Sequence, residues 1–201
     1  MKSSFLRWGS ALLCAVILSA CGGNNGSLAL QGTVSGLSKS GLVLVNKNTG
    51  EKLTIAAYQT SFVFTKLLAQ DEAFDIEVDT APAGATCTLT NNKATASVYT
   101  SYTTTVTCKN NPHVLGGTVK GLSGTGLVLA NGADSVPVLP PATAGADVTF
   151  VFPTNVGDGD QYGVTVLTQP TGQSCTVNAA NNPGTMPSAD QLGLLVNCVS
   201  N

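Results

Sequence analysis

Cysteine is the residue type here best able to form covalent bonds, and the last four cysteines fall into two pairs. Cys87 and Cys108 are 21 residues apart, and Cys175 and Cys198 are 23 apart. In an exported protein such pairs are typical of disulfides, because an oxidising compartment preserves them. A four-thiolate metal site is the alternative, but it needs short Cys-x-x-Cys spacing, which is absent. We expect two bridges, Cys87–Cys108 and Cys175–Cys198, and no bound cofactor.

Acid–base chemistry would depend on a single histidine, His113. No serine lies in a Gly-x-Ser-x-Gly motif, so a Ser-His-Asp arrangement would have to be built around His113 alone. This residue follows Pro112 in a short connecting segment, where we expect a solvated side chain. We predict no catalytic residue and a protein that is not an enzyme.

A second acid–base candidate is a row of carboxylates. Asp75, Glu77 and Asp79 alternate with apolar residues and share one strand face. Paired carboxylates can perform general acid–base work. In the second half of the chain, however, the corresponding positions hold Gly163, Thr165 and Leu167. We therefore expect a solvated acidic face.

Asp158-Gly159-Asp160 is the densest polar cluster and a weak candidate for Ca²⁺, which prefers carboxylate and carbonyl oxygens. The alternative is a plain turn, since Asp-Gly is common at hairpin tips. Tyr58, Tyr99 and Tyr102 offer surfaces on which a sugar could stack. Aromatic residues at strand spacing more often lie in the core or pack across strands, and we expect these three tyrosines to do so.

The first twenty residues have the pattern of an export signal. Lys2 and Arg7 precede an apolar run from 10 to 19 that is too short to span a bilayer. The run ends in Leu18-Ser19-Ala20-Cys21, which resembles the lipobox of bacterial lipoproteins. The resemblance implies cleavage before Cys21 and acylation of its thiol, which anchors the protein in a membrane. Cys14 does not fit, because bulky Leu13 precedes it. The alternative is an ordinary cleaved signal with an incidental cysteine.

Residues after the anchor indicate location and a tether. In Gram-negative lipoproteins, Asp after the acylated Cys directs retention in the inner membrane, so Gly22 favours the outer membrane. Residues 21–27 are rich in Gly and Asn and are expected to be a flexible tether. Without residues 1–20 the chain keeps seven lysines against eleven acidic residues, a formal charge of −4. A mildly acidic, Lys-poor protein lacks the basic patch with which proteins bind nucleic acid.

An internal repeat organises the rest of the chain. Residues 32–46 read GTVSGLSKSGLVLVN and residues 117–131 read GTVKGLSGTGLVLAN, with eleven of fifteen positions identical. Phe-Val-Phe recurs at 62–64 and 150–152, and the last cysteine of each copy differs by 90 in number. We therefore predict one module at 28–110, a linker at 111–114 and a second module at 115–201.

Within each copy, short alternating segments are separated by Gly, Asn and Pro turns. In the first copy they predict strands over 30–34, 42–46, 52–56, 61–65, 73–79, 87–90 and 99–109. About seven short strands in some 80 residues indicate a β-sandwich. The expected fold is all-β, with two tandem antiparallel sandwiches and one disulfide in each. A disordered Thr-rich stalk is the alternative, and the paired Phe positions argue against it.

The order of motifs resembles prealbumin-like modules of secreted bacterial proteins, and more closely an uncharacterised Cys-containing module of bacterial surface lipoproteins. Residues 162–175, YGVTVLTQPTGQSC, carry the resemblance best, whereas residues 81–85 of the first copy depart from it. The resemblance implies fold and location but no activity. We expect a non-enzymatic envelope protein that serves as a spacer or protein-binding unit. The alternative is binding of glycan or Ca²⁺ through loops of the second module, such as 137–145 and 181–187.

Overall fold

The computed structural model describes residues 26–201. The expected signal peptide and the lipidation site Cys21 lie outside the described residues, as does most of the tether. The described chain is all-β: apart from one 3-10 turn at Ala179–Asn181, its regular elements are strands. No helix in residues 26–201 is long and apolar enough to cross a membrane.

Residues 28–110 form a sandwich of two four-stranded sheets. One sheet has the order β4-β1-β8-β6 and the other β3-β2-β5-β7. The strands are β1 (Leu28–Ser35), β2 (Leu42–Asn46), β3 (Glu51–Ile55), β4 (Ser61–Leu68), β5 (Ala73–Thr80), β6 (Ala85–Thr90), β7 (Lys93–Thr95) and β8 (Thr104–Asn110).

Residues 115–201 form a second sandwich with equivalent pairing. Its sheets have the orders β13-β10-β19-β17 and β12-β11-β16, the ribbon β15-β18 completes it, and β14 pairs with the connector strand β9. The strands are β9 (Pro112–His113), β10 (Leu115–Lys120), β11 (Leu127–Asn131), β12 (Asp134–Val138), β13 (Val148–Val151), β14 (Val156–Gly157), β15 (Gln161–Tyr162), β16 (Val164–Thr168), β17 (Gln173–Val177), β18 (Gly184–Thr185) and β19 (Gln191–Ser200).

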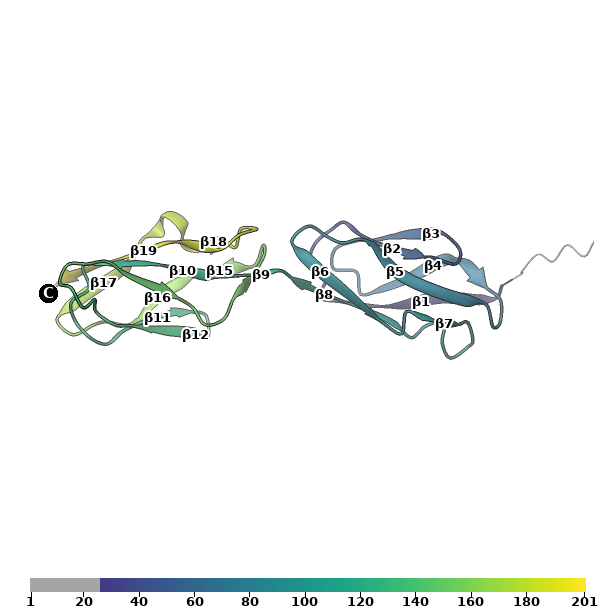
Figure 1. Ribbon diagram of the computed structural model, residues 1–201, viewed down its shortest axis with the longest axis horizontal. Helices are drawn as coiled ribbons and strands as arrows, with labels where there is room; N and C mark the ends of the chain where they lie inside the picture. The colour runs from purple at the N-terminus through teal and green to yellow at the C-terminus, as the bar shows by residue number, and fades with distance from the viewer. Residues whose placement is uncertain (1–25) are drawn as a thin grey trace, which may run out of the picture.

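The expected all-β sandwich class is confirmed, with one refinement of strand direction. In each sandwich the first strand pairs in parallel with the last: β1 with β8, and β10 with β19. The other strand pairs are antiparallel. Because the first and last strands run in the same direction, the chain enters and leaves each sandwich at opposite ends. The two sandwiches therefore follow each other end to end (Figure 1).

Each sandwich encloses its own apolar core. The first core contains Phe62 and Phe64 and the second contains Phe150 and Phe152, all at most 4% exposed. In each pair the rings meet edge to face with centroids 5.9 Å apart, a favourable arrangement for aromatic quadrupoles. Alternation along the strand places both rings on the buried face, as the Phe-x-Phe motif predicts.

The two disulfides join neighbouring strands in each sandwich. Cys87 of β6 lies directly opposite Cys108 of β8. Likewise, Cys175 of β17 lies opposite Cys198 of β19. The four cysteines are thus paired as their spacing suggested, and each bridge ties the final strand to its sheet.

The final strand of the first sandwich begins later than expected. Residues 97–103 form a turn, and β8 starts at Thr104. The Ser97 hydroxyl accepts hydrogen bonds from the amides of Tyr99 and Thr100, and Thr100 Oγ1 accepts one from the Ser97 amide at 2.9 Å. Such local side-chain bonds compete with strand pairing. Strand β7, which precedes this turn, was not predicted.

Candidate functional site at the junction of the two sandwiches

The connecting segment between the sandwiches is hydrogen-bonded on both sides. Pro112 and His113 form strand β9, which pairs with β14 of the second sandwich. The Asn111 amide donates to the Gly84 carbonyl of the first sandwich at 2.9 Å, and the Asn111 carbonyl accepts from the Asp158 amide at 2.8 Å. This backbone bonding fixes the connector at the entrance of the second sandwich.

The central side-chain contact of the junction is an ion pair between Lys39 and Asp158. Lys39 lies in the turn after β1, and its ammonium donates to a carboxylate oxygen of Asp158 and, at 3.4 Å, to the Gly84 carbonyl. The Asp158 residue is only 6% exposed. The bond from Lys39 is the main cause that lowers the pKa of Asp158 below its ordinary value. One ammonium thus bridges both sandwiches.

Gly84 allows this close approach. Its φ of +69° lies in the left-handed region, and a Cβ there would collide with the Asp158 carboxylate and the Lys39 ammonium. Glycine is therefore required both by the backbone conformation and by the space. The Pro-x-Gly motif thus supplies a turn against which the second sandwich can pack.

A parallel chain of neutral and charged groups reinforces the ion pair. Ser38 Oγ donates to Asn110 Oδ1 at 3.0 Å, and Asn110 Nδ2 donates to Asp160 Oδ1 at 2.8 Å. Asn110 is the last residue of β8, and Asp160 follows Asp158 on the same loop. Two carboxylates of one loop are therefore each engaged by a different element of the first sandwich.

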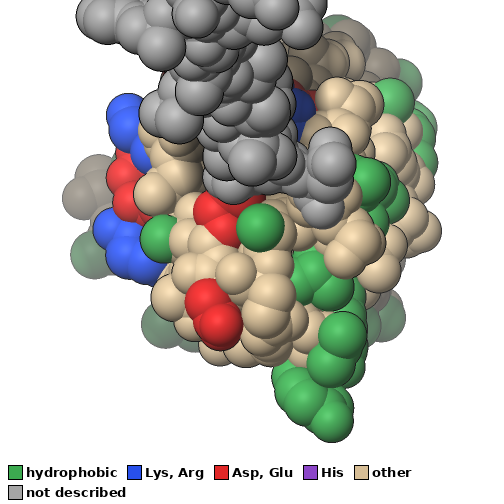
Figure 2. All heavy atoms as spheres, turned by 90° about the vertical axis from the view of Figure 1, so that its right-hand side faces the viewer, with side chains coloured by type: hydrophobic (Ala, Val, Ile, Leu, Met, Phe, Trp, Pro, Cys, Tyr) green, Lys and Arg blue, Asp and Glu red, His purple; other side chains and the backbone are tan. Residues whose placement is uncertain are grey.

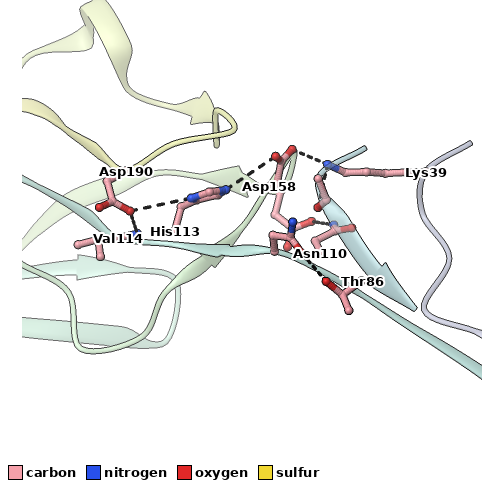
Figure 3. A network of polar contacts seen from close by, with 10 residues as sticks. Lys39, Thr86, Asn110, His113, Val114, Asp158 and Asp190 are labelled. Carbon is pink, nitrogen blue, oxygen red and sulfur yellow. Dashed lines mark hydrogen bonds and ion pairs between the residues drawn. The ribbon is translucent and has the colours of Figure 1, made fainter. Parts of the chain in front are cut away.

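His113 lies between two carboxylates (Figure 3). Its Nε2 is 3.8 Å from Asp158 Oδ2 and its Nδ1 is 3.9 Å from Asp190 Oδ1. The Asp190 carboxylate also accepts the Val114 amide at 2.8 Å. The His113 side chain is only 20% exposed, so the expectation of a solvated connector residue was wrong. Pairing of β9 with β14 turns the ring into the junction.

Asp158 and Asp160, the weak Ca²⁺ candidates, are therefore both in use. Lys39 donates to Oδ1 of Asp158, and Asn110 donates to Oδ1 of Asp160. Among the described residues, no three His, Cys, Asp or Glu side chains are grouped to hold a metal ion. The loop at 158–160 is therefore a turn, as in the alternative interpretation, and its carboxylates also bind residues of the first sandwich.

The repeat shows which junction residues are special. The turn that holds Lys39 (36–41) corresponds to 121–126, where Gly124 replaces the lysine. The turn that holds Asp158 corresponds to 70–72. The Gly159 amide donates to the Met186 carbonyl in the second sandwich, and the Asp71 amide donates to the Ala96 carbonyl in the first. Asp158 therefore aligns with Gln70. The ion pair exists only where the two sandwiches meet.

The acidic face of β5 carries ion pairs. Asp75 is 2.8 Å from Lys93 and Asp79 is 2.8 Å from Lys52, while Glu77 lies 3.6 Å from Lys47. Each carboxylate has its own lysine: Lys93 lies on the adjacent strand β7, Lys47 in the turn after β2, and Lys52 on β3, two strands away. The carboxylates do not converge on a shared proton. The face can form cross-strand salt bridges, and its geometry differs from that of an acid–base pair.

The three exposed tyrosines are the clearest failure of sequence reasoning. Tyr58 is 79% exposed, Tyr99 76% and Tyr102 49%, and all three lie in turns. The expectation of cross-strand packing was therefore wrong. Tyr58 has a φ of +63° and lines a shallow groove with Val34, Leu37 and Thr60. A signal was present: Ser and Thr surround Tyr99 and Tyr102, and these residues favour turns.

Of the two loops expected to meet a partner, one is open over most of its length and the other belongs to the sandwich. Pro137 is part of strand β12, which ends at Val138. Residues 139–147 form an open loop, in which Leu139 is 74% exposed. In 181–187, by contrast, Asn182 Nδ2 donates to the Val164 carbonyl at 2.8 Å and β18 pairs with β15. The second segment is part of the sandwich.

Fold and junction together define the class: an all-β protein of β-sandwiches, each with one disulfide, held end to end by an ion pair and a bonded connector. No protein-family model matches the chain, and no curated protein is significantly similar to it.

Proposed function

We propose that this protein is a non-enzymatic lipoprotein of the bacterial envelope, anchored through acylated Cys21, in which the sandwiches form a stiff spacer. The outer membrane is the proposed location. The part of the protein farthest from the anchor, the second sandwich, is the proposed binding unit for an envelope protein.

The ion pair of Lys39 with Asp158 is the observation that carries the spacer proposal. A spacer must resist bending where its units meet. Here the connector is bonded to both sandwiches, and a buried carboxylate of one is neutralised by an ammonium of the other. Each sandwich therefore uses one end for stacking, and the chain enters and leaves it at opposite ends (Figure 1).

The rival functions have less support. A Ca²⁺ site on the loops of the second sandwich would need Asp158 and Asp160, whose carboxylates face the first sandwich. A hydrolase would need a nucleophile beside His113. In the part of the chain that the structure describes, no serine or cysteine is hydrogen-bonded to that imidazole. Two disulfides favour an oxidising compartment outside the cytoplasm.

The anchor is tested by labelling cells that express the full chain with a fatty acid. We expect label in the parent protein, none in Cys21→Ser, and unchanged label in the matched control Cys14→Ser. Label that persists in Cys21→Ser would overturn the anchor.

The spacer is tested in vesicles that carry the acylated protein. A donor dye attached after Asn201 should transfer little energy to an acceptor lipid. Lys39→Met should raise the transfer, because the second sandwich would lean toward the bilayer. High transfer in the parent protein would contradict a stiff spacer, and equally low transfer in both proteins would show that the backbone bonds of the connector hold the junction without Lys39.

A further inference from the structure

The free end of the first sandwich, where β1 begins, exposes a group of apolar side chains. The turn between β7 and β8 presents Val98, Tyr99 and Tyr102, which are 59%, 76% and 49% exposed, and Leu67 near the end of β4 is 51% exposed. An end-on view shows hydrophobic side chains projecting from the rim of this end (Figure 2). We call Val98, Tyr99 and Tyr102 the tip residues.

The tip lies at the end where the chain leads toward Cys21. The Gln31 amide near the start of β1 donates to the Ser101 carbonyl of the turn at 2.8 Å. Gly26 passes directly over the backbone of Leu67 and Leu68. Gly26 lies five positions after Cys21, and a fully extended chain over that interval reaches at most roughly 18 Å. An acyl chain on Cys21 would hold this end of the sandwich close to a bilayer.

The repeat supplies an internal comparison. Ala96 and Met186 occupy equivalent positions, so the tip residues Val98 and Tyr99 correspond to Ser188 and Ala189. The two turns have the same length, because residue numbers in the second copy exceed those in the first by 90 both at the turn and at the last cysteine of β8 and β19. At the second sandwich this end faces another protein module and these two positions carry small side chains, whereas Leu192, the counterpart of Tyr102, is 52% exposed. At the first sandwich it carries a valine and a tyrosine instead.

We propose that the tip residues contact the lipid bilayer that holds the Cys21 anchor, an inference that rests on the proposed anchoring. Tyrosine suits this position, because its ring enters the apolar boundary while its hydroxyl stays with the headgroups. The contact gives the spacer a defined orientation relative to the membrane. Acidic Asp71 is exposed at the same end, so a zwitterionic surface is the appropriate lipid.

The test uses tryptophan as a depth probe. The chain contains one tryptophan, Trp8, within the segment expected to be cleaved. Acylated full-length protein with Tyr99→Trp is placed in phosphatidylcholine vesicles with brominated chains, and the parent protein serves as the blank. We expect the emission to shift to shorter wavelength and to be quenched by the bromines.

Tyr58→Trp is the matched control, because Tyr58 is 79% exposed in the same sandwich but near the junction. Its emission should be neither shifted nor quenched. Val98→Asp, added to Tyr99→Trp, should reduce the quenching because a carboxylate resists entry into lipid. Val63→Asp, on the exposed face of β4, should leave it unchanged.

The outcomes separate this inference from the anchor. If the protein floats with vesicles but Tyr99→Trp is quenched no more than Tyr58→Trp, the tip contact is wrong and the anchor stands. If the protein does not float with vesicles, the anchor itself fails and the tip contact fails with it. Both tyrosines project into solvent, so neither substitution removes a core contact.

Discussion

Lys39 and Asp158 are 119 residues apart in sequence and form an ion pair across the junction of the two sandwiches. Asp158 is buried, and the ammonium that neutralises it also donates to the Gly84 carbonyl. A buried carboxylate without a partner is costly, so the two sandwiches are held at the orientation in which Lys39 reaches it.

Removing the ammonium should loosen the junction. In Lys39→Met the aliphatic stem remains but Asp158 loses its counter-charge. With spin labels at the exposed residues Thr90 of β6 and Thr176 of β17, we expect a broader distance distribution than in the parent protein. Lys52→Met is the control, because its partner Asp79 lies within the first sandwich. An unchanged distribution in Lys39→Met would show that the backbone bonds alone hold the junction.

Acid should loosen the same junction. The pKa of Asp158 is lowered, chiefly by the bond from Lys39. A group whose pKa falls on folding stabilises the folded state above its unfolded value, roughly pH 4, and this contribution is lost as the pH falls through the lowered pKa. The distance distribution should therefore broaden below about pH 4. In Lys39→Met the acid-induced step should shrink, and a step of equal size would assign it to other carboxylates.

Each disulfide should contribute to the stability of its own sandwich. Bridges that close loops of 21 and 23 residues remove about 3 kcal/mol of chain entropy from the unfolded state. Replacing Cys175 and Cys198 by alanine should lower the free energy of unfolding of the second sandwich by that amount in urea. Amide signals of the first sandwich should report an unchanged transition. A loss that appears equally in both sandwiches would contradict separate cores.

The phenylalanine of the second core offers a test of packing. Phe152 is 1% exposed, so Phe152→Ala should cost about 3–5 kcal/mol in a urea titration. Val151 is the adjacent residue on the opposite strand face and is 48% exposed. Val151→Ala should change the stability by about 0.5 kcal/mol or less. Similar costs for both substitutions would mean that Phe152 is not at the centre of a core.

The alternation of apolar and polar residues predicted the buried side chains wherever a strand buries one face. Alternation around Phe62 and Phe64 predicted which rings enter the core, and the repeat predicted the same for Phe150 and Phe152. It failed at Tyr99 and Tyr102, where the hydroxyls of Ser97 and Thr100 bond to nearby amides and bend the chain into a turn. In this segment the local side-chain hydrogen bonds form in place of strand pairing.

The sequence by itself determined the sandwich class and the cysteine pairs, because strand periodicity and cysteine spacing are local properties of the chain. Only the tertiary structure decided what joins the sandwiches. Lys39 looks like an ordinary turn residue, and the Asp-Gly-Asp segment at 158–160 indicated a turn or a weak Ca²⁺ site, not a partner for a lysine 119 positions earlier. Their contact depends on the relative orientation of two folded bodies, set by the parallel strand β8, the connector bonds of Asn111 and the space left at Gly84. Such an orientation has no signature within a window of sequence, because the residues that fix it lie on separate turns.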